Sequence, residues 1–255
     1  SMNTGPMSSP TSGAVLAVTG TSTDVGKTIV IAALAVSAQA LGADVAVCKP
    51  VQTGVAPGEA GDLATIVALA GHLTTVECAR YPEPLAPETA ARRAGLPSVD
   101  RADIAAAVDA LTMTHELTLV EGAGGVMVRL APSLTIADVA ADTQAGVVVV
   151  VQPGLGALNH AELTVDALRA RGLRPAGLVI GWWPADADLA MRCNRDDLPR
   201  LTGVPVVGVI PSGASALDAT HFRAAAPGWL DAQWLRTELS QSGQTLNNIK
   251  QGVLS

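Results

Sequence analysis

The stretch GTSTDVGKT, residues 20–28, limits the folds open to this chain more than any other segment. It follows a short apolar run, Ala14 to Thr19, and leads into KTIVIAALAVSAQALG, where the composition and the closing Gly42 predict a helix with a glycine at its C-terminus. A strand, a glycine-bearing loop and a helix in this order are typical of phosphate-binding loops, because the first N–H groups of the helix and its dipole attract an anion.

The loop departs from the usual pattern in one respect, since five residues rather than four separate Gly20 and Gly26. Lys27 would still supply a positive charge to the terminal phosphates, and the Thr28 hydroxyl would ligate magnesium. The alternative is an ordinary glycine turn followed by a surface lysine. The polar residues 21–24, Thr-Ser-Thr-Asp, favour a loop wrapped around phosphate oxygens. We therefore predict that this loop binds a nucleoside triphosphate.

The rest of the chain alternates short runs rich in Val, Leu and Ile with Ala-rich stretches of helical length. This pattern predicts an α/β fold with a doubly wound, mainly parallel sheet and helices on both faces. The expected strands are Ala14 to Thr19, Asp44 to Cys48, Leu117 to Val120, Val147 to Val151, Ala176 to Ile180 and Pro205 to Ile210. Two stretches rich in Gly or Pro, Gln52 to Gly61 and Tyr81 to Pro87, are expected to form loops at the functional rim.

A length of 255 residues, 49% of them hydrophobic, is ample for one sizeable core. We expect a single domain over residues 14–239, a disordered segment at residues 1–13 and a flexible tail at residues 240–255. Further helices are expected over Asn159 to Gly172 and over Ala226 to Leu239.

Charge and cysteine content exclude several classes of protein. The net charge of −7 opposes binding to nucleic acid or to an anionic membrane surface, and no apolar run approaches the roughly 18–20 residues of a membrane helix. Cys48, Cys78 and Cys193 are odd in number and widely spaced, which predicts neither a disulfide framework nor a zinc site. These features favour a cytoplasmic protein that acts on a small molecule.

Charged residues stand near the expected ends of several strands, where ligands of doubly wound sheets bind. Lys49 is expected at the exit of the second strand with Pro50 fixing the turn, Glu121 directly after Leu117 to Val120, and Asp62 after the flexible loop. Glu121 and Asp62 are candidate magnesium ligands. Each residue also has an ordinary explanation, namely a solvated charge for Lys49, a helix N-cap for Asp62 and an exposed turn for Glu121. Their gathering around one phosphate loop favours function for Lys49 and Glu121 more than for Asp62.

Taken together, GTSTDVGKT, VCKPVQTG, VEGAGG and LGALNHAELT, in this order and spacing, resemble the dethiobiotin synthetase family from the first strand to near Trp234. The longer loop is part of that family's pattern. The resemblance implies an ATP- and Mg²⁺-dependent ligase of biotin biosynthesis, which converts 7,8-diaminopelargonate, CO2 and ATP into dethiobiotin, ADP and phosphate. The implied route passes through a carbamate and a carbamic-phosphoric anhydride, without a covalent enzyme intermediate.

The same resemblance implies roles for individual residues. Lys27 and Lys49 would be catalytic, with Lys49 holding the carbamate and neutralising the transferring phosphoryl group. The implied magnesium ligands are Thr28, Asp62 and Glu121. The implied nucleotide-binding residues are Asp24, Val25, Gly26, Lys27, Thr28, Ile29, Asp62, Glu121, Gly122, Ala123, Gly124, Gly181, Trp182, Pro211, Ser212 and Gly213. The implied substrate-binding residues are Thr53, Gly156, Ala157, Leu158 and Asn159. Because the loop Leu155 to Asn159 would reach the substrate of a neighbouring subunit, the resemblance also implies a homodimer.

One departure and two rival functions remain. Many family members have an asparagine that reads adenine where this chain has Gly181 followed by Trp182, so the sequence does not decide which base is preferred. A tryptophan could stack on a base or pack at the sheet edge.

A nucleotide switch of the partitioning or cell-division type would carry a second lysine early in the loop, where this chain has Thr-Ser-Thr-Asp. It would also carry a basic amphipathic C-terminal helix, whereas the tail here has only Lys250. An amidotransferase or cobalamin-pathway ligase would need a glutaminase domain, for which we expect no room.

Overall fold

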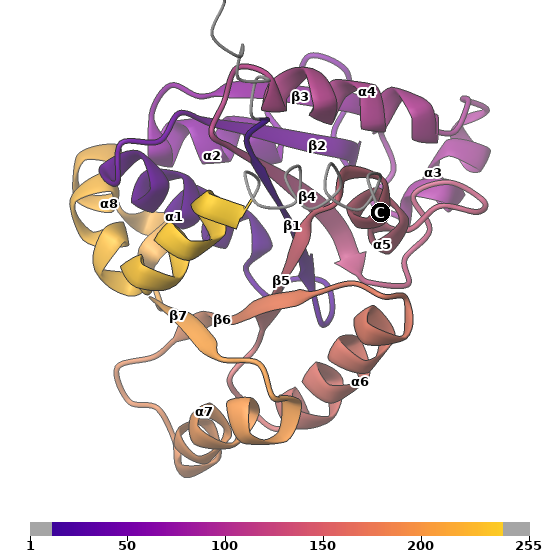
Figure 1. Ribbon diagram of the computed structural model, residues 1–255. Helices are drawn as coiled ribbons and strands as arrows, with labels where there is room; N and C mark the ends of the chain where they lie inside the picture. Colours follow the sequence, from indigo (N-terminus) through magenta and orange to yellow (C-terminus); the bar gives the residue numbers. More distant parts are fainter. Residues whose placement is uncertain (1–11, 242–255) are drawn as a thin grey trace, which may run out of the picture.

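The protein is described by a computed structural model over residues 12–241 (Figure 1). Within these residues, seven strands form one sheet in the order β3-β2-β4-β1-β5-β6-β7, and every neighbouring pair is parallel. This confirms the predicted α/β, doubly wound sheet. The strands are β1 Ala14–Gly20, β2 Val45–Thr53, β3 Thr74–Tyr81, β4 Leu117–Gly125, β5 Gly146–Val151, β6 Pro175–Trp183 and β7 Val206–Pro211.

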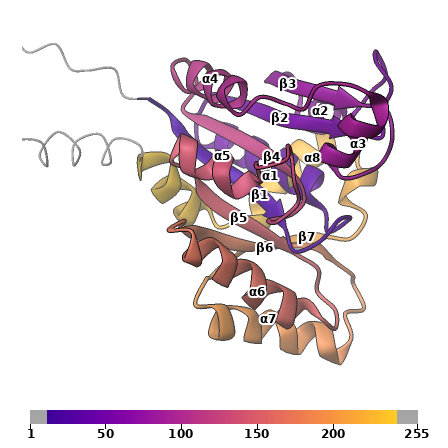
Figure 2. The same cartoon turned by 90° about the vertical axis from the view of Figure 1, so that its right-hand side faces the viewer.

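Helices connect the strands and cover both faces of the sheet (Figures 1 and 2). They are α1 Lys27–Ala40, α2 Asp62–Ala70, α3 Pro87–Ala94, α4 Arg101–Thr112, α5 Ile136–Thr143, α6 Ala157–Ala170, α7 Leu189–Thr202 and α8 Ala219–Ala225, with the 3-10 helices η1 Ala214–Ala216 and η2 Ala226–Trp229. In residues 12–241, none of the helices combines the length and the apolar character needed to cross a bilayer.

Two hydrophobic cores flank the sheet, one on each face. The first packs α1, α2 and α8 against the sheet and includes Ile31, Leu34 and Phe222. The second packs α3 to α7 against the opposite face and includes Ile104 and Leu198. Because both faces are covered, a central strand such as β5, with the sequence GVVVVV, is buried at every position. This is why its continuous apolar run predicts it correctly.

The strand β3 has no counterpart in the predicted set. It lies at the edge of the sheet and pairs only with β2 among the described strands, and its sequence TTVECARY is half-buried along most of its length. An edge strand with charged side chains lacks the continuous apolar run by which the other strands were found. The predicted loop from Tyr81 to Pro87 is therefore shorter at both ends, because Tyr81 ends β3 and Pro87 begins α3.

The strand β2 continues past the predicted end at Cys48. Its pairing with β4 stops at Cys48–Val120, whereas its pairing with β3 runs on to Thr53–Tyr81. Lys49 and Pro50 are thus inside β2 and not in a turn, and Gln52 and Thr53 are strand rather than loop residues, so these predictions were wrong. Pro50 has no N–H to donate, and the strand parts from β4 next to it. Lys49 and Glu121 are the first residues of the two strands beyond the last paired positions.

At both ends of the domain, the structure differs from the predicted boundaries. Gly13, expected to be disordered, donates its N–H to the Thr112 carbonyl at 2.9 Å. The helix expected from Ala226 begins instead with η2, which contains Pro227, and a regular helix follows over residues 232–241. Residues 240 and 241, expected in the tail, are therefore helical, while residues 1–11 and 242–255 lie outside the described part of the chain.

Candidate active site

The phosphate loop connects the carboxyl end of β1 to the first turn of α1, as predicted. Gly26 precedes α1 in the left-handed conformation, with φ 102°. A Cβ atom at Gly26 would lie 2.9 Å from the Gly181 carbonyl oxygen, and one at Gly181 would lie 1.8 Å from that of Val25. Both positions therefore require glycine, which lets the phosphate loop pack directly on the end of β6.

Two polar groups of the loop region are held away from water. Lys27 is 9% exposed, and its burial lowers the pKa of the ammonium group despite the nearby charge of Glu121. The Thr21 hydroxyl oxygen is buried without a hydrogen-bond partner among the described residues. A buried polar group without a partner is costly. The loop is thus built to meet polar ligand atoms that satisfy it, as phosphate oxygens would.

Lys49 stands at the centre of a charged network beside this loop. Its Nζ atom lies 2.8 Å from Asp62 Oδ2 and 3.5 Å from Glu121 Oε1. The Thr28 hydroxyl donates to the same Glu121 Oε1 at 2.8 Å. The structure therefore joins Thr28, Lys49, Asp62 and Glu121, which come from α1, β2, α2 and β4, into one cluster at the carboxyl edge of the sheet.

Burial and pairing set the ionisation of this cluster. Desolvation opposes the charge of Lys49, whose side chain is 5% exposed, but the combined attraction of Glu121 and Asp62 outweighs it and raises the pKa of the lysine. Complete burial raises the pKa of Glu121, although Lys49 pulls in the opposite direction. Lys49 is therefore held as a cation, whereas the carboxylate of Glu121 is stabilised only as far as its partners compensate for burial.

The cluster fits a magnesium ion. Glu121 Oε2 is buried and has no hydrogen-bond partner in residues 12–241. The described residues contain no group of three or more His, Cys, Asp or Glu side chains that could hold a metal by itself. Magnesium is commonly held by one or two carboxylates together with substrate phosphates and water, so Asp62, Glu121 and the Thr28 hydroxyl beside the phosphate loop form a suitable donor set.

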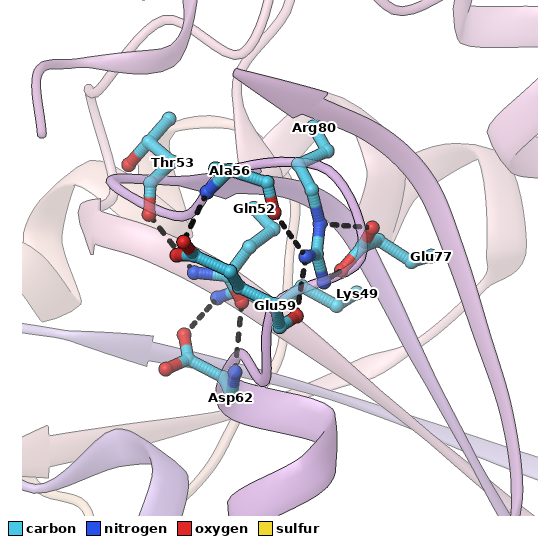
Figure 3. Close-up of polar contacts among 8 residues, drawn as sticks. All are labelled: Lys49, Gln52, Thr53, Ala56, Glu59, Asp62, Glu77 and Arg80. Carbon is cyan, nitrogen blue, oxygen red and sulfur yellow. Dashed lines mark hydrogen bonds and ion pairs between the residues drawn. The ribbon is translucent and has the colours of Figure 1, made fainter. Parts of the chain in front are cut away.

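All three ordinary explanations fail in the structure. Lys49 is buried inside β2 and is therefore not a solvated charge. Asp62 is the first residue of α2, Gly61 is its N-cap, and no side chain caps the helix, so the Asp62 carboxylate is turned to Lys49 and is not an N-cap. Glu121 is 2% exposed and is therefore not in an exposed turn. It lies inside β4, which continues to Gly125, so the prediction that it directly follows the strand was wrong. Gln52 was missed as a site residue, although its Oε1 accepts the Asp62 N–H at 2.9 Å (Figure 3). Gln52 lies within the motif VCKPVQTG, which was the signal that could have found it.

The glycine-rich end of β4 lies against the phosphate loop. Gly125 pairs with Gly20, and a Cβ atom on Gly124 would lie 3.6 Å from the Thr23 methyl group. Gly124 and Gly125 therefore lie against the loop, and nucleotide binding by Gly122, Ala123 and Gly124 stays a prediction. Within the loop and α1, Val25 is buried, while Asp24 is exposed and has φ 56°. Ile29 packs against the core that covers α1, so its contact with a nucleotide would be through the backbone.

The predicted base-binding residues come together at the ends of β6 and β7. The Ser212 N–H donates to the Trp183 carbonyl at 2.9 Å, and Trp183 pairs with Pro211. Trp182 is 36% exposed, whereas the Arg195 guanidinium carbon lies 5.0 Å from the centre of the Trp183 ring. Arg195 thus covers one face of the Trp183 ring, while the Trp182 side chain is partly exposed.

The predicted substrate residues fall into two groups. Thr53 ends β2 beside the charged cluster, and residues 156–159 form the start of α6 after β5, where Gly156 has φ 91°. Leu155 is 86% exposed and Asn159 is also exposed, so both side chains are open to solvent in the single chain. Asn194 of α7, which was missed, fixes the loop by donating to the carbonyls of Pro153 and Gly154 at 3.0 and 2.8 Å.

Comparisons with known proteins identify related sequences. A family model described as an AAA domain matches residues 14–219. The chain is 57% identical to the ATP-dependent dethiobiotin synthetase BioD of Rhodococcus jostii over 89% of this chain and 99% of that protein. It is 48% identical to that of Mycobacterium bovis over 87% of this chain and 97% of that protein.

Two solved structures resemble the fold alone. They are a ParA family ATPase from Chlorobium tepidum and the septum site-determining protein MinD from Pyrococcus horikoshii. The ParA structure has a TM-score of 0.56 and 13% identity, covering 90% of this chain and 98% of that one. The MinD structure has a TM-score of 0.55 and 15% identity, covering 93% and 98%. At this identity, the shared sheet says nothing about a switch function.

Proposed function

This chain belongs to the ATP-dependent dethiobiotin synthetase family, and we propose that its carboxyl-edge site forms dethiobiotin by way of a carbamate and a carbamic-phosphoric anhydride. The observation that carries the proposal is the placement of Lys49, a buried cation held between Asp62 and Glu121 next to a phosphate loop. In this site a carbamate and a triphosphate would meet around one fixed positive charge.

The proposed reaction starts when one amine of 7,8-diaminopelargonate adds to CO2 and loses a proton, giving the carbamate. A carbamate oxygen attacks the γ-phosphorus of ATP, and the bond to the ADP oxygen breaks. The second amine then attacks the carbamate carbon, the ureido ring closes, phosphate leaves and a proton is released. Lys49 would hold the carbamate and neutralise the transferring group, and Lys27 would hold the terminal phosphates.

The residues contribute mainly by positioning and by compensating charge. Together these effects are worth on the order of 10 kcal/mol in activation free energy. Magnesium, when bound, would neutralise the phosphate charge that develops during transfer, and Thr28, Asp62 and Glu121 would hold it. Thr28 already donates its hydroxyl hydrogen to Glu121, which orients the hydroxyl oxygen in the ligand-free protein.

An oxygen-labelling experiment tests this route. Purified protein is mixed with the diamine, ATP, magnesium and ¹⁸O-labelled CO2 in unlabelled water and quenched within the first turnovers, before the label exchanges with water. An anhydride places one CO2 oxygen in the released phosphate and leaves the other in the ring of dethiobiotin. Phosphate without label would contradict the anhydride, and absence of dethiobiotin would contradict the proposed reaction altogether.

Base selection belongs to the same proposal. Trp182 offers a flat, partly exposed ring where an asparagine would discriminate by hydrogen bonds, and stacking tolerates any base. We expect several nucleoside triphosphates to support the reaction with Michaelis constants within about tenfold of one another. Repeating the assay with each triphosphate in turn measures this. A preference for ATP of a hundredfold or more would contradict it.

We also propose a homodimer in which residues 155–159 reach the diamine of the partner subunit. Exposed apolar side chains support it, because Leu155 is 86% exposed and Leu163, on α6, is 61% exposed. Light scattering of the purified protein should give twice the chain mass, and Leu163→Arg should shift it toward the monomer. A monomeric wild-type protein would contradict the dimer. A cytoplasmic location is part of the proposal, supported by three free thiols, none of which forms a disulfide.

A further inference from the structure

The loop between β2 and α2, residues 54–61, connects two residues of the proposed site but contains neither helix nor strand. Thr53 precedes it and Asp62 follows it. Within the loop, the hydrogen bond from the Glu59 N–H to the Ala56 carbonyl, at 3.1 Å, joins backbone to backbone. A Gly- and Pro-rich segment with so few internal hydrogen bonds would be expected to sample many conformations. Something outside the loop must therefore hold it in place.

Arg80 of β3 makes two such contacts, in addition to the bonds that the Gly54 N–H at the start of the loop donates to the Tyr81 and Glu83 carbonyls at 3.0 and 3.2 Å. Its Nη1 atom donates to the carbonyl oxygens of Ala56 at 3.0 Å and of Glu59 at 2.6 Å (Figure 3). The two carbonyls belong to different parts of the loop, so one guanidinium fixes both. In Figure 3 the guanidinium lies between the loop and the side chain of Glu77.

Glu77 in turn orients Arg80. The Arg80 Nε atom donates to Glu77 Oε2 and Nη2 donates to Glu77 Oε1, both at 2.8 Å. This two-point contact leaves the guanidinium plane little freedom to turn. The sheet register places the pair beside the site, because Glu77 pairs with Lys49 and Arg80 with Gln52 across β2 and β3.

The contacts continue from the loop to Asp62. Gln52, which is 5% exposed, accepts the Asp62 N–H at 2.9 Å and donates to the Thr53 carbonyl at 2.9 Å. A Cβ atom on Gly61 would lie 2.7 Å from Gln52 Oε1 and 3.3 Å from Arg80 Nη2. The backbone just before Asp62 therefore packs directly against both side chains. Displacing Arg80 would release the loop at the point where α2 begins.

We propose that Arg80 is a positioning residue for the reaction, an inference that rests on the proposed function. Oriented by Glu77, it holds residues 54–61 so that the Asp62 carboxylate faces Lys49 and the metal position, and so that Thr53 faces the diamine. Arg80 touches neither substrate nor metal in this scheme. It acts through the loop, and its loss lets the loop sample conformations in which Asp62 turns away from Lys49.

The first test measures the loop itself in protein without substrate or metal. Hydrogen–deuterium exchange of residues 55–61 is compared in the wild type, Arg80→Met, Arg80→Lys and Glu77→Gln. We expect exchange at least about tenfold faster in Arg80→Met, with smaller increases in the other two variants, because each keeps part of the contact. Arg101→Met is the matched control, since Arg101 makes a similar two-point contact with Asp142, at 2.6 and 2.7 Å, on α4 and α5. It should leave exchange in residues 55–61 unchanged.

The second test separates positioning from general loss of folded protein. In Arg80→Met we expect the magnesium concentration for half-maximal rate and the diamine Michaelis constant each to rise about tenfold, while the nucleotide Michaelis constant changes less than about twofold. A loss of folded protein would instead lower the rate and leave all three constants unchanged. Arg80→Lys should recover part of the shift, and Arg101→Met should show none.

The outcomes are distinct. An active wild type together with unchanged exchange or unchanged constants in Arg80→Met overturns the role of Arg80. If Arg80→Met fails to fold, the same criteria apply to Glu77→Gln, which keeps the arginine but removes one of its carboxylate oxygens. A wild type that makes no dethiobiotin overturns the proposed function, whereas the exchange measurement still decides whether Arg80 holds the loop.

Discussion

At the amino end of the sheet lies a cleft of about 620 Å³, whereas the charged cluster lies at the opposite, carboxyl end. The cleft is lined by the first residues of β1 and β5 and by Arg174 and Glu238. Arg174 contacts Glu238 at two points, at 2.8 and 2.7 Å. At the carboxyl end, Lys49 and Glu121 are both buried, and Glu121 Oε2 has no partner among residues 12–241.

The difference shows that the volume of a cavity does not identify the site here. Ion pairs satisfied on their own chain, as between Arg174 and Glu238, leave nothing for a ligand to complete. A buried carboxylate oxygen and a buried loop hydroxyl without partners are costly until a ligand meets them. The Thr118 hydroxyl, near the amino end of β4, is also buried without a partner among the described residues, but it does not line the cleft. The carboxyl end thus has unpartnered polar atoms at the charged cluster and in the phosphate loop, whereas the charged pair that lines the cleft at the amino end is satisfied. Substitutions at the carboxyl end should therefore impair catalysis far more than a substitution at the amino end.

Lys49→Ala should have the largest effect. Removing the cation that faces both the carbamate and the transferring phosphoryl group should lower turnover by at least about 1,000-fold. Nucleotide binding should stay within about threefold of the wild type, because the phosphate loop and Lys27 remain. Steady-state rates and calorimetric titration with a non-hydrolysable nucleotide measure the two quantities. Retained synthesis would remove Lys49 from the mechanism.

Glu121→Gln should come next, with turnover lowered about 100-fold and a higher magnesium requirement. It should also change how stability depends on pH. Because the pKa of Glu121 is raised in the folded metal-free protein, the wild type loses free energy of unfolding as pH rises from the unfolded pKa, near 4.3, through the folded one. The variant has no carboxyl group at position 121, so its free energy of unfolding relative to the wild type should increase over this pH range. Denaturant unfolding at several pH values checks the sign, and a parallel pH dependence would contradict it.

Asn159→Ala should raise the Michaelis constant of the diamine about tenfold and leave that of the nucleotide unchanged. If Asn159 serves the partner's site, hybrid dimers of Asn159→Ala and Lys49→Ala chains contain one intact site. Co-refolded mixtures should then regain activity with the wild-type Michaelis constant. Homodimers of each variant serve as controls. Mixtures no more active than the sum of the homodimers would place Asn159 with its own subunit's site or with none.

Arg174→Met, at the amino end, should have the smallest effect on catalysis. Its partner Glu238 is 5% exposed and would lose a charged hydrogen-bond donor, so the free energy of unfolding should fall by about 1–2 kcal/mol. Turnover and all Michaelis constants should stay within about twofold of wild type. Urea unfolding and steady-state kinetics measure the two. A change in a Michaelis constant as large as that expected for Asn159→Ala would contradict the conclusion that only the carboxyl end of the sheet serves catalysis.

Sequence alone determined the fold class, six of the seven described strands and the phosphate loop, since these depend on local patterns. Runs such as GVVVVV are apolar because both faces of a parallel sheet are covered, and Gly26, Lys27 and Thr28 are adjacent in the chain. The motifs also placed Lys49, Asp62 and Glu121 among the candidates. These inferences needed no knowledge of which distant segments meet.

The contacts among those residues became known only from the folded chain. The edge strand β3 has mixed polarity, and its presence keeps β2 in the sheet beyond Cys48, so Lys49 is buried in a strand and not solvated in a turn. The Asp62 carboxylate forms an ion pair with Lys49, and Arg80 donates hydrogen bonds to the loop of residues 54–61. Each of these contacts joins residues of separate elements. Such contacts depend on register and packing, which periodicity in a single chain does not encode.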